Sequence, residues 1–275
     1  MVTTFIHDQQ VLVNCGYIYP ITTRTVPTYN QPLIELVHQA AKSLHRPIYF
    51  VDVGAAVGDT ILLVSSNCRE NVEHYFAVDG DKEFFDYLTH NLSGRNDCTL
   101  FNALLSSDEG SMQSLIRTHQ GTASAQGTGE VQSTTLDKLL QDAISQSKVD
   151  VIKIDIDGFD GRALSGAREA LKIASAVIFE WHPILYQQTG NSWLEPFRIL
   201  TECEFTNLVW FNKFGNFYQF TNVPDRDSLD KMAEYCLADI GDDWHWDIVA
   251  LKSDTDISMI DLARMRFAQN RTSRW

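Results

Sequence analysis

A turn containing two glycines is the first feature of this sequence that can do chemistry. The run Y-F-V-D-V-G-A-A-V-G-D-T places Gly54 and Gly58 directly after an apolar strand, and apolar residues at helical spacing restart at Ile61. Glycines let the backbone turn sharply and let a ligand approach without a Cβ in the way. Asp59 or Thr60 can cap the new helix. The pattern predicts a strand, a tight turn and a helix start that can hold a nucleoside ligand.

An acidic residue closes the next apolar run, H-Y-F-A-V-D. This residue, Asp79, follows Gly58 by about 20 positions. At that place a carboxylate can accept hydrogen bonds from both ribose hydroxyls of a nucleoside cofactor. Taken alone, the glycine turn can be purely structural, and Asp79 can be a solvated turn residue beside Gly80 and Asp81. Position and spacing together favour a cofactor site.

The residue two positions before the first glycine indicates which cofactor. An acid at Asp52 can face the cationic methionyl end of S-adenosylmethionine, because a sulfonium and an ammonium group need negative partners. A dinucleotide instead needs a helix N-terminus free for its pyrophosphate. The close G-x-G-x-x-G spacing of dinucleotide sites is also missing from this turn. We therefore expect S-adenosylmethionine.

Polar residues after two later apolar runs can form the chemical end of the site. Asp155 and Asp157 follow V-I-K-I, and Glu180 and His182 follow V-I-F. Ligands of open α/β sheets lie beyond the carboxyl ends of the strands, so these groups should converge. We expect His182, Asp155 and Glu180 to be catalytic. His182 is our first choice of general base because imidazole titrates near neutral pH, with Asp155 as its orienter or the alternative base.

Two other roles are open to these residues. His182 can stack on Trp181 and cap the turn at Pro183. Asp155, Glu180 and His182 can also hold Mg²⁺ and lower the pKa of a bound hydroxyl. We prefer the interpretation in which the carboxylates organise a loop through backbone N–H groups, and we expect no resident metal.

The elements that must position these residues alternate between β-branched apolar runs and amphipathic segments, as in a parallel sheet covered by helices. The class is α/β. Predicted strands are residues 48–53, 74–78, 98–104, 149–156 and 176–181. Predicted helices are residues 60–67, 82–91, 135–143 and 161–173. Downstream we expect helices at 193–203 and 228–239, an antiparallel pair at 205–211 and 215–221, and an apolar run at 247–251. Residues 117–130, rich in glycine and small polar residues, predict a mobile loop.

Composition excludes several classes of protein. The chain has 275 residues, 44% of them hydrophobic, which suffices for one substantial core. Its net charge of -14 would repel a phosphate backbone, so we expect no nucleic-acid partner. Five scattered cysteines without a C-x-x-C pair support neither a zinc knuckle nor a disulfide framework. Without a secretory leader or a long apolar stretch, we expect a cytoplasmic protein that does not span a membrane.

The ordered series of motifs resembles the FkbM-like family of S-adenosylmethionine-dependent methyltransferases. V-D-V-G-A-A-V-G-D-T is similar to the family's first motif, A-V-D-G-D to its acidic second strand end, and N-A-L-L-S-S-D-E-G to its third strand and turn. T-T-L-D-K-L then precedes I-K-I-D-I-D-G-F-D-G-R-A-L-S-G-A, which resembles the most distinctive block, and I-F-E-W-H-P resembles the next strand end. The resemblance covers about residues 49–183.

The resemblance implies a Rossmann-like class I methyltransferase fold, with a mostly parallel seven-stranded sheet, helices on both faces and a C-terminal antiparallel hairpin. It also implies methyl transfer from S-adenosylmethionine to a hydroxyl, usually on a sugar or a secondary metabolite in natural product biosynthesis. Residues that match the family's cofactor contacts by position are Gly54, Ala56 and Gly58 for the methionyl and ribose part, Asp79 for the ribose, and Asn102 with Ala103 for the adenine. Asp155 joins them at the methyl group.

The sequence departs from the family pattern at several of these positions. Ala56 stands where the family usually has Asn, and Asp79 and Gly80 stand where Glu and Pro are common. Asp157 and Asp160 replace two glutamates. The carboxylates are kept but shortened by one methylene, which leaves the chemistry intact and changes distances.

We expect three parts: an N-terminal helical cover (1–46), the S-adenosylmethionine-dependent methyltransferase domain (47–252) and a C-terminal helix or tail (253–275). The acceptor is expected to be a small molecule with a hydroxyl, recognised by the cover, the 117–130 segment and the C-terminal third, where Trp244 and Trp246 flank His245. An NAD-dependent oxidoreductase and a non-catalytic Rossmann-like binding protein are the alternatives. N- or C-methylation and the oligomeric state stay open.

Overall fold

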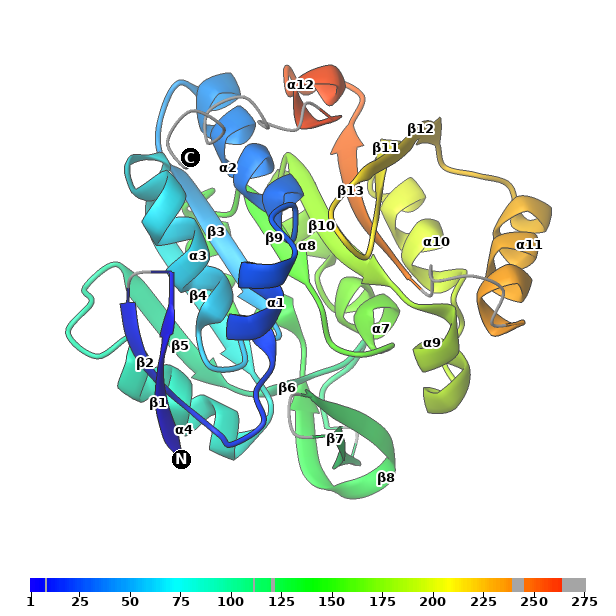
Figure 1. Cartoon of the computed structure of the whole chain (residues 1–275). Helices are drawn as coiled ribbons and strands as arrows, with labels where there is room; N and C mark the ends of the chain where they lie inside the picture. Colours follow the sequence, from blue (N-terminus) through cyan, green and yellow to red (C-terminus); the bar gives the residue numbers. More distant parts are fainter. Residues whose placement is uncertain (8, 111, 120–121, 239–244, 264–275) are drawn as a thin grey trace.

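The computed structural model describes residues 1–7, 9–110, 112–119, 122–238 and 245–263. An eight-stranded sheet lies at its centre (Figure 1). The strand order is β12-β11-β13-β10-β9-β3-β4-β5. The parallel strands are β10 (Ala176–Trp181), β9 (Val151–Ile154), β3 (Ile48–Val53), β4 (Val72–Asp79) and β5 (Cys98–Asn102). The antiparallel additions are β13 (Trp246–Lys252), β11 (Phe205–Asn212) and β12 (Phe217–Asn222). The predicted α/β class and C-terminal hairpin are confirmed, and β12 brings the expected seven strands to eight.

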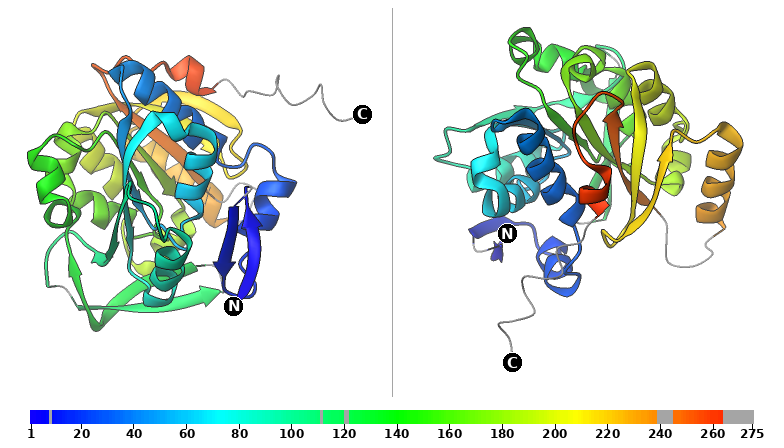
Figure 2. Two further views of the ribbon diagram at one scale, coloured as in Figure 1. Left: turned by 90° about the vertical axis from the view of Figure 1, so that its left-hand side faces the viewer. Right: turned by 90° about the horizontal axis from the view of Figure 1, so that it is seen from above.

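Helices cover both faces of the sheet and enclose two hydrophobic cores (Figure 2). Neighbouring strand residues alternate between the cores: Phe50 packs into the first and Val51 into the second. The helices of the first core are α1 (Tyr19–Thr25), which contributes Tyr19, α2 (Gln31–Leu44), α3 (Asp59–Cys68), α4 (Lys82–Asn91) and α12 (Met259–Ala263). Those of the second core are α5 (Leu136–Leu139), α6 (Gln141–Ser145), α7 (Asp160–Ser165), α8 (Arg168–Ile173), α9 (Pro183–Thr189), α10 (Glu195–Glu202) and α11 (Arg226–Leu237).

The N-terminal segment is only partly the predicted helical cover. It begins with an antiparallel hairpin of β1 (Val2–Ile6) and β2 (Gln9–Val13), which lies against α3 and α4, and continues into α1 (Tyr19–Thr25) and α2. The prediction missed the alternation in Q-Q-V-L-V, which buries Val11 and Val13 in the first core and leaves Gln10 and Leu12 more exposed.

Within the segment 117–130, predicted as a mobile loop, residues 117–119 and 122–130 belong to the two strands of a β-hairpin. β7 (Met112–His119) and β8 (Thr122–Thr134) are antiparallel, and β8 also pairs in parallel with the short β6 (Leu104–Leu105). The prediction was wrong because glycines and small residues permit an extended backbone as readily as a loop. Pairing then satisfies the backbone N–H and C=O groups.

The end of the chain is described only to residue 263. Within the predicted tail (253–275), α12 packs against α2. Residues 264–275, Trp244 and the last residue of the helix predicted at 228–239 lie outside the described residues. In the described ranges, the structure has no helix with the length and apolar character needed to cross a bilayer.

Candidate functional site

The turn after β3 is built around a close approach of two backbones. Gly54 has φ +82°, and a Cβ there would lie 1.9 Å from the carbonyl oxygen of Asp155, at the end of the neighbouring strand β9. The Gly54 and Ala55 N–H groups donate hydrogen bonds to the carbonyl oxygen of Val78 on β4. Only glycine allows this conformation and this contact together. The turn is thereby locked between the ends of β4 and β9.

Asp79, at the end of β4, ties the next loop to this turn. Its carboxylate accepts hydrogen bonds from the Ala56 N–H and the Asp81 N–H, both at 2.8 Å. Burial raises the pKa of Asp79 to about 7, although these two backbone hydrogen bonds lower it. The solvated-turn alternative is therefore wrong, because the Asp79 residue is only 8% exposed. Asp81 in turn caps α4 by accepting from the Glu83 and Phe84 N–H groups.

A cavity of about 270 Å³ opens above the turn. Of the residues predicted to bind the cofactor, those that line it are Gly54, Ala56, Asp79, Ala103 and Asp155. The cavity is also lined by Phe84, Leu104 and Leu105, which give it an apolar wall beside the Asp79 carboxylate. It therefore combines a polar floor with an apolar side, as small-molecule sites do.

Three residues predicted as cofactor contacts do not line this cavity. Asn102 instead donates a hydrogen bond from its side chain to the Asp79 carbonyl oxygen, at 2.9 Å. Gly58, in a left-handed conformation at φ +91°, starts α3 and packs against Leu88 of α4. Asn102 and Gly58 therefore hold the loops around the cavity in place without lining it. The third residue that does not line the cavity is Asp52.

Asp52 lies under the cavity floor, paired with a lysine that the sequence analysis overlooked. The two residues are register partners on adjacent parallel strands, and the Lys153 Nζ is 3.2 Å from the Asp52 carboxylate and 3.4 Å from that of Asp155. Burial alone would lower the pKa of Lys153, but Asp52, Asp155 and Asp59 raise it. Asp52 therefore pairs with Lys153 and does not line the cavity, whereas Lys153 and Asp155 do. A lysine inside the buried run V-I-K-I is the signal that could have revealed this pair.

The first turn of α3 contributes a further acid to the cavity. Asp59 and Thr60 both line it, and neither caps the helix, because Gly58 holds the N-cap position without a side-chain hydrogen bond. Burial raises the pKa of Asp59 to about 7, although Lys153 lowers it. The helix N-terminus thus presents a carboxyl group to the cavity.

The N-terminal segment closes the cavity with tyrosines. Tyr17, Tyr19 and Tyr29 all line it. The Tyr19 and Tyr29 rings meet edge to face at 5.9 Å, and Tyr17 stacks on Tyr19 at 6.4 Å. Sequence reasoning missed them because residues 14–30 carry no periodic pattern that would fix their direction.

A second, smaller cavity of about 30 Å³ adjoins the first. The residues that line both are Asn30, Lys153 and Asp155, and the second continues to Glu180 and Asp247. The predicted convergence of Asp155 and Glu180 beyond the strand ends therefore holds. Asp157, in a left-handed conformation at φ +52°, lines only the larger cavity.

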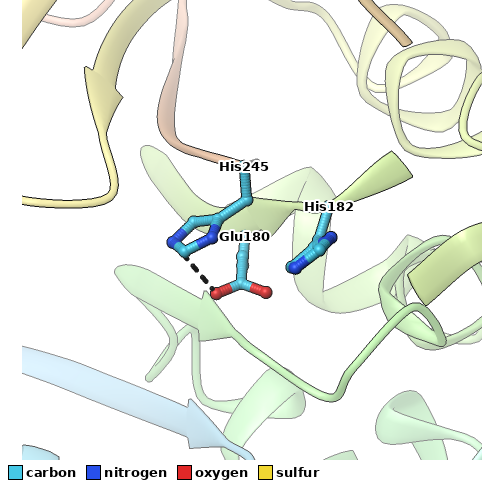
Figure 3. A group of neighbouring side chains, drawn as sticks. All are labelled: Glu180, His182 and His245. Carbon is cyan, nitrogen blue, oxygen red and sulfur yellow. Dashed lines mark ion pairs between the residues drawn. The ribbon is translucent and has the colours of Figure 1, made fainter. Parts of the chain in front are cut away.

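Beyond Glu180, two histidines face each other (Figure 3). The His182 and His245 rings stack with centroids 5.2 Å apart, and the His245 Nε2 lies 3.5 Å from the Glu180 carboxylate. One potential ligand atom from each of the three residues lies within 4.8 Å of the other two. Burial lowers the pKa of His182 to about 4 and that of His245 to about 3, so both imidazoles are neutral at pH 7.

This arrangement corrects two alternatives from the sequence. His182 stacks on His245, whereas Trp181 packs on Trp246 in the second core, and the side chain of His182 caps no turn. The group with metal-ligand geometry contains His245 in place of the predicted Asp155. In sequence, His245 stands alone, and only the pairing of β13 with β10 brings it to the end of β10.

A family model described as the methyltransferase FkbM domain matches residues 52–207, more than half of the chain. None of the curated proteins matches this chain. Among solved structures, the chain is similar to a methyltransferase FkbM from Methylobacillus flagellatus KT, at 15% identity and a TM-score of 0.45, over 74% of this chain and 43% of that one. The chain thus spans less than half the length of that protein.

Two further solved structures are similar at 10% identity. One is the magnesium protoporphyrin IX methyltransferase ChlM from Synechocystis PCC 6803 with bound SAM, with a TM-score of 0.41 over 87% of this chain and 86% of that one. The other is the plantazolicin methyltransferase BpumL in complex with a pentazolic desmethylPZN analog and SAH, with a TM-score of 0.44 over 84% of this chain and 85% of that one.

Proposed function

Because the chain belongs to the FkbM methyltransferase domain family, we propose that it transfers a methyl group from S-adenosylmethionine to a hydroxyl of a small molecule, such as a sugar or a secondary metabolite. The observation that carries the proposal is the single cavity that joins the Gly54 turn, Asp79 and Asp155. It offers a carboxylate for the ribose at one end, and a lysine and a carboxylate for the methionyl group at the other.

The residues of the larger cavity fit the cofactor part by part. Asp79 would accept hydrogen bonds from the ribose hydroxyls, and Ala103 with the apolar wall would contact the adenine. At the other end, Lys153 would meet the methionyl carboxylate, and Asp155 would face the ammonium group. The carboxyl group of Asp59 at the start of α3 argues against a dinucleotide, because a pyrophosphate needs that helix end free of negative charge.

We place the reacting hydroxyl group of the acceptor at the smaller cavity, because its volume of about 30 Å³ suits a group of that size. The cofactor supplies an activated methyl group, which the acceptor oxygen attacks in line while its proton leaves. Asp155 lies on the wall common to both cavities, so we assign it the proton. In this assignment Asp155 replaces His182 as the first choice of base, because His182 faces His245 and Glu180.

Calorimetric titration of the purified protein with S-adenosylmethionine and, separately, with NAD tests the proposal. We expect micromolar binding of the former, loss of at least tenfold in affinity in Asp79→Ala, and unchanged affinity in Asp142→Ala, a matched change of an exposed acid. Binding of NAD alone would favour an oxidoreductase. Binding of S-adenosylmethionine without transfer to any hydroxyl acceptor would favour a binding protein.

A further inference from the structure

The register of two antiparallel strands brings Glu180, His182 and His245 together. Glu180 and His182 lie two residues apart at the end of β10, so their side chains leave on the same face. Trp246 of β13 stands opposite Trp181 on the other face, and His245, one residue earlier, therefore joins the face of His182. Glu180 lies within β10, and His182 and His245 directly adjoin the paired ends of β10 and β13.

The three side chains have unused bonding capacity. Among the described residues, the Glu180 carboxylate has no hydrogen bond and no lysine or arginine ion pair, and its nearest partner is the His245 Nε2 at 3.5 Å. The Nδ1 atoms of both His182 and His245 are buried, and neither has a hydrogen-bond partner in the described part of the chain. Buried polar atoms normally find a partner, so a missing ligand is indicated.

The ionisable groups that act on Glu180 are acids. The aspartates that act electrostatically on Glu180 are Asp155, Asp157, Asp160 and Asp247. Lys153 of β9 is already shared by Asp52 and Asp155, and Lys213 acts electrostatically on His245. A divalent ion at the two histidines would supply the positive partner that Glu180 lacks.

We propose that Glu180, His182 and His245 bind one divalent transition metal ion. Imidazole nitrogen suits zinc, iron, nickel and copper, whereas Mg²⁺ prefers an all-oxygen shell, so the set differs from the Mg²⁺ site considered for Asp155, Glu180 and His182. Ligand atoms about 2.1 Å from a tetrahedral ion are about 3.4 Å apart. The candidate ligand atoms lie within 4.8 Å of one another, so the side chains would have to bring them closer together around the ion.

Three protein ligands leave at least one coordination position open, the arrangement of catalytic rather than structural metal sites. Of the three ligands, Glu180 lines the smaller cavity, so the ion would lie beside the space assigned to the acceptor hydroxyl. This role rests on the proposed function. The ion would bind the acceptor hydroxyl and lower its pKa. The proton passes to Asp155, the new oxygen–carbon bond forms as the sulfur–methyl bond breaks, S-adenosylhomocysteine leaves, and the metal keeps its oxidation state.

Titration with Co²⁺, followed by visible absorbance, tests the site without any methyl transfer. We expect one ion per chain in the metal-free protein, displaced by Zn²⁺, with Glu180→Gln, His182→Asn and His245→Asn each weakening binding at least tenfold. His90→Asn, which changes an exposed histidine of α4, should bind as the unchanged protein does.

Thermal unfolding with and without Co²⁺ separates loss of the site from loss of the fold. We expect the ion to raise the melting temperature of the unchanged chain and of His90→Asn, and to leave that of each folded ligand variant unmoved. No Co²⁺ binding at millimolar concentration, or equal binding by all variants, would overturn the site. Co²⁺ binding together with no binding of S-adenosylmethionine would leave the site standing and refute the proposed function.

Discussion

Asp52 on β3 and Lys153 on β9 stand opposite each other in the parallel sheet, with carboxylate and ammonium 3.2 Å apart beneath the floor of the larger cavity. Asp52 is fully buried, and Lys153 extends onward to Asp155 at 3.4 Å. A buried pair is weakened far more by removing one partner than by replacing both, because the remaining charge is left without compensation. The pair therefore couples the stability of the sheet to the position of Asp155.

We expect Asp52→Asn to lower the free energy of unfolding by about 3 kcal/mol, since it removes the shorter of the two ion pairs that Lys153 makes within the described residues. The double variant Asp52→Asn/Lys153→Met should be less destabilised than the sum of the two single variants. Urea denaturation of all four proteins measures this coupling. Additive losses would show that the pair does not act as a unit.

Replacing Gly54 should destroy the cofactor site. In Gly54→Ala, the new Cβ would meet the Asp155 carbonyl oxygen at 1.9 Å, so the turn must move away from β9. We expect loss of S-adenosylmethionine binding and destabilisation by more than about 2 kcal/mol.

Gly94→Ala is the matched control for this substitution. Gly94 has φ +83°, almost the same as Gly54, but nothing lies within 4 Å of its Cβ position. The free energy of unfolding of Gly94→Ala should fall only by the roughly 1 kcal/mol that a left-handed alanine costs, and the variant should keep its affinity for the cofactor. Calorimetry and thermal unfolding of both variants give the comparison. Similar losses in the two would mean that backbone conformation, and not the contact with Asp155, makes Gly54 necessary.

The protein without cofactor should become less stable as the pH rises from 5 to 8. Burial raises the pKa of Asp59, Asp79 and Asp157 to about 7, above the value of about 3.9 in an unfolded chain. Between these two values the folded state binds more protons, so its stability falls with rising pH until about pH 7. Asp157→Asn should reduce the fall by on the order of 2 kcal/mol. Denaturant unfolding at pH 5 and at pH 8 measures the fall in the free energy of unfolding for both proteins. A stability that rises with pH in the unchanged protein would contradict the prediction.

The order of motifs made the sheet and the cofactor end predictable. Gly54 and Asp79 stand at strand ends, and parallel strands bring such ends to one edge. The direction of Asp52 was not predictable from the motif alone, because it depends on which strand lies beside β3. Once β9 is known to be that neighbour, Asp52 and Lys153 fall opposite each other.

The remaining errors concern residues whose positions depend on long-range pairing. His245 reaches Glu180 only because β13 inserts between β10 and β11, a connection that no local pattern encodes. The β7–β8 hairpin likewise depends on pairing rather than on strong strand-forming runs. Tyr29 enters the cavity from a segment without periodicity, so its role could not be anticipated.

Tyr29 should favour the charged cofactor over its neutral product. Its ring lines the larger cavity, and its pKa is raised by burial and then by Asp247, Asp155 and Glu180, which places it at the chemical end of the site. An aromatic face near a sulfonium contributes about 0.5–2 kcal/mol, and the uncharged sulfur of S-adenosylhomocysteine gains none of this. We therefore expect Tyr29→Leu to weaken binding of S-adenosylmethionine about fivefold and to leave that of S-adenosylhomocysteine unchanged.

Titration of both compounds into the unchanged protein, Tyr29→Leu and Tyr29→Phe tests this charge effect. Tyr29→Phe keeps the ring and should keep the preference for the charged compound. Tyr49→Leu removes a ring that lies beside Arg46 and Lys148 outside the cavity, and should alter neither affinity. Equal weakening of both compounds in Tyr29→Leu would mean that the ring contributes only packing, because an effect on charge must separate sulfonium from thioether.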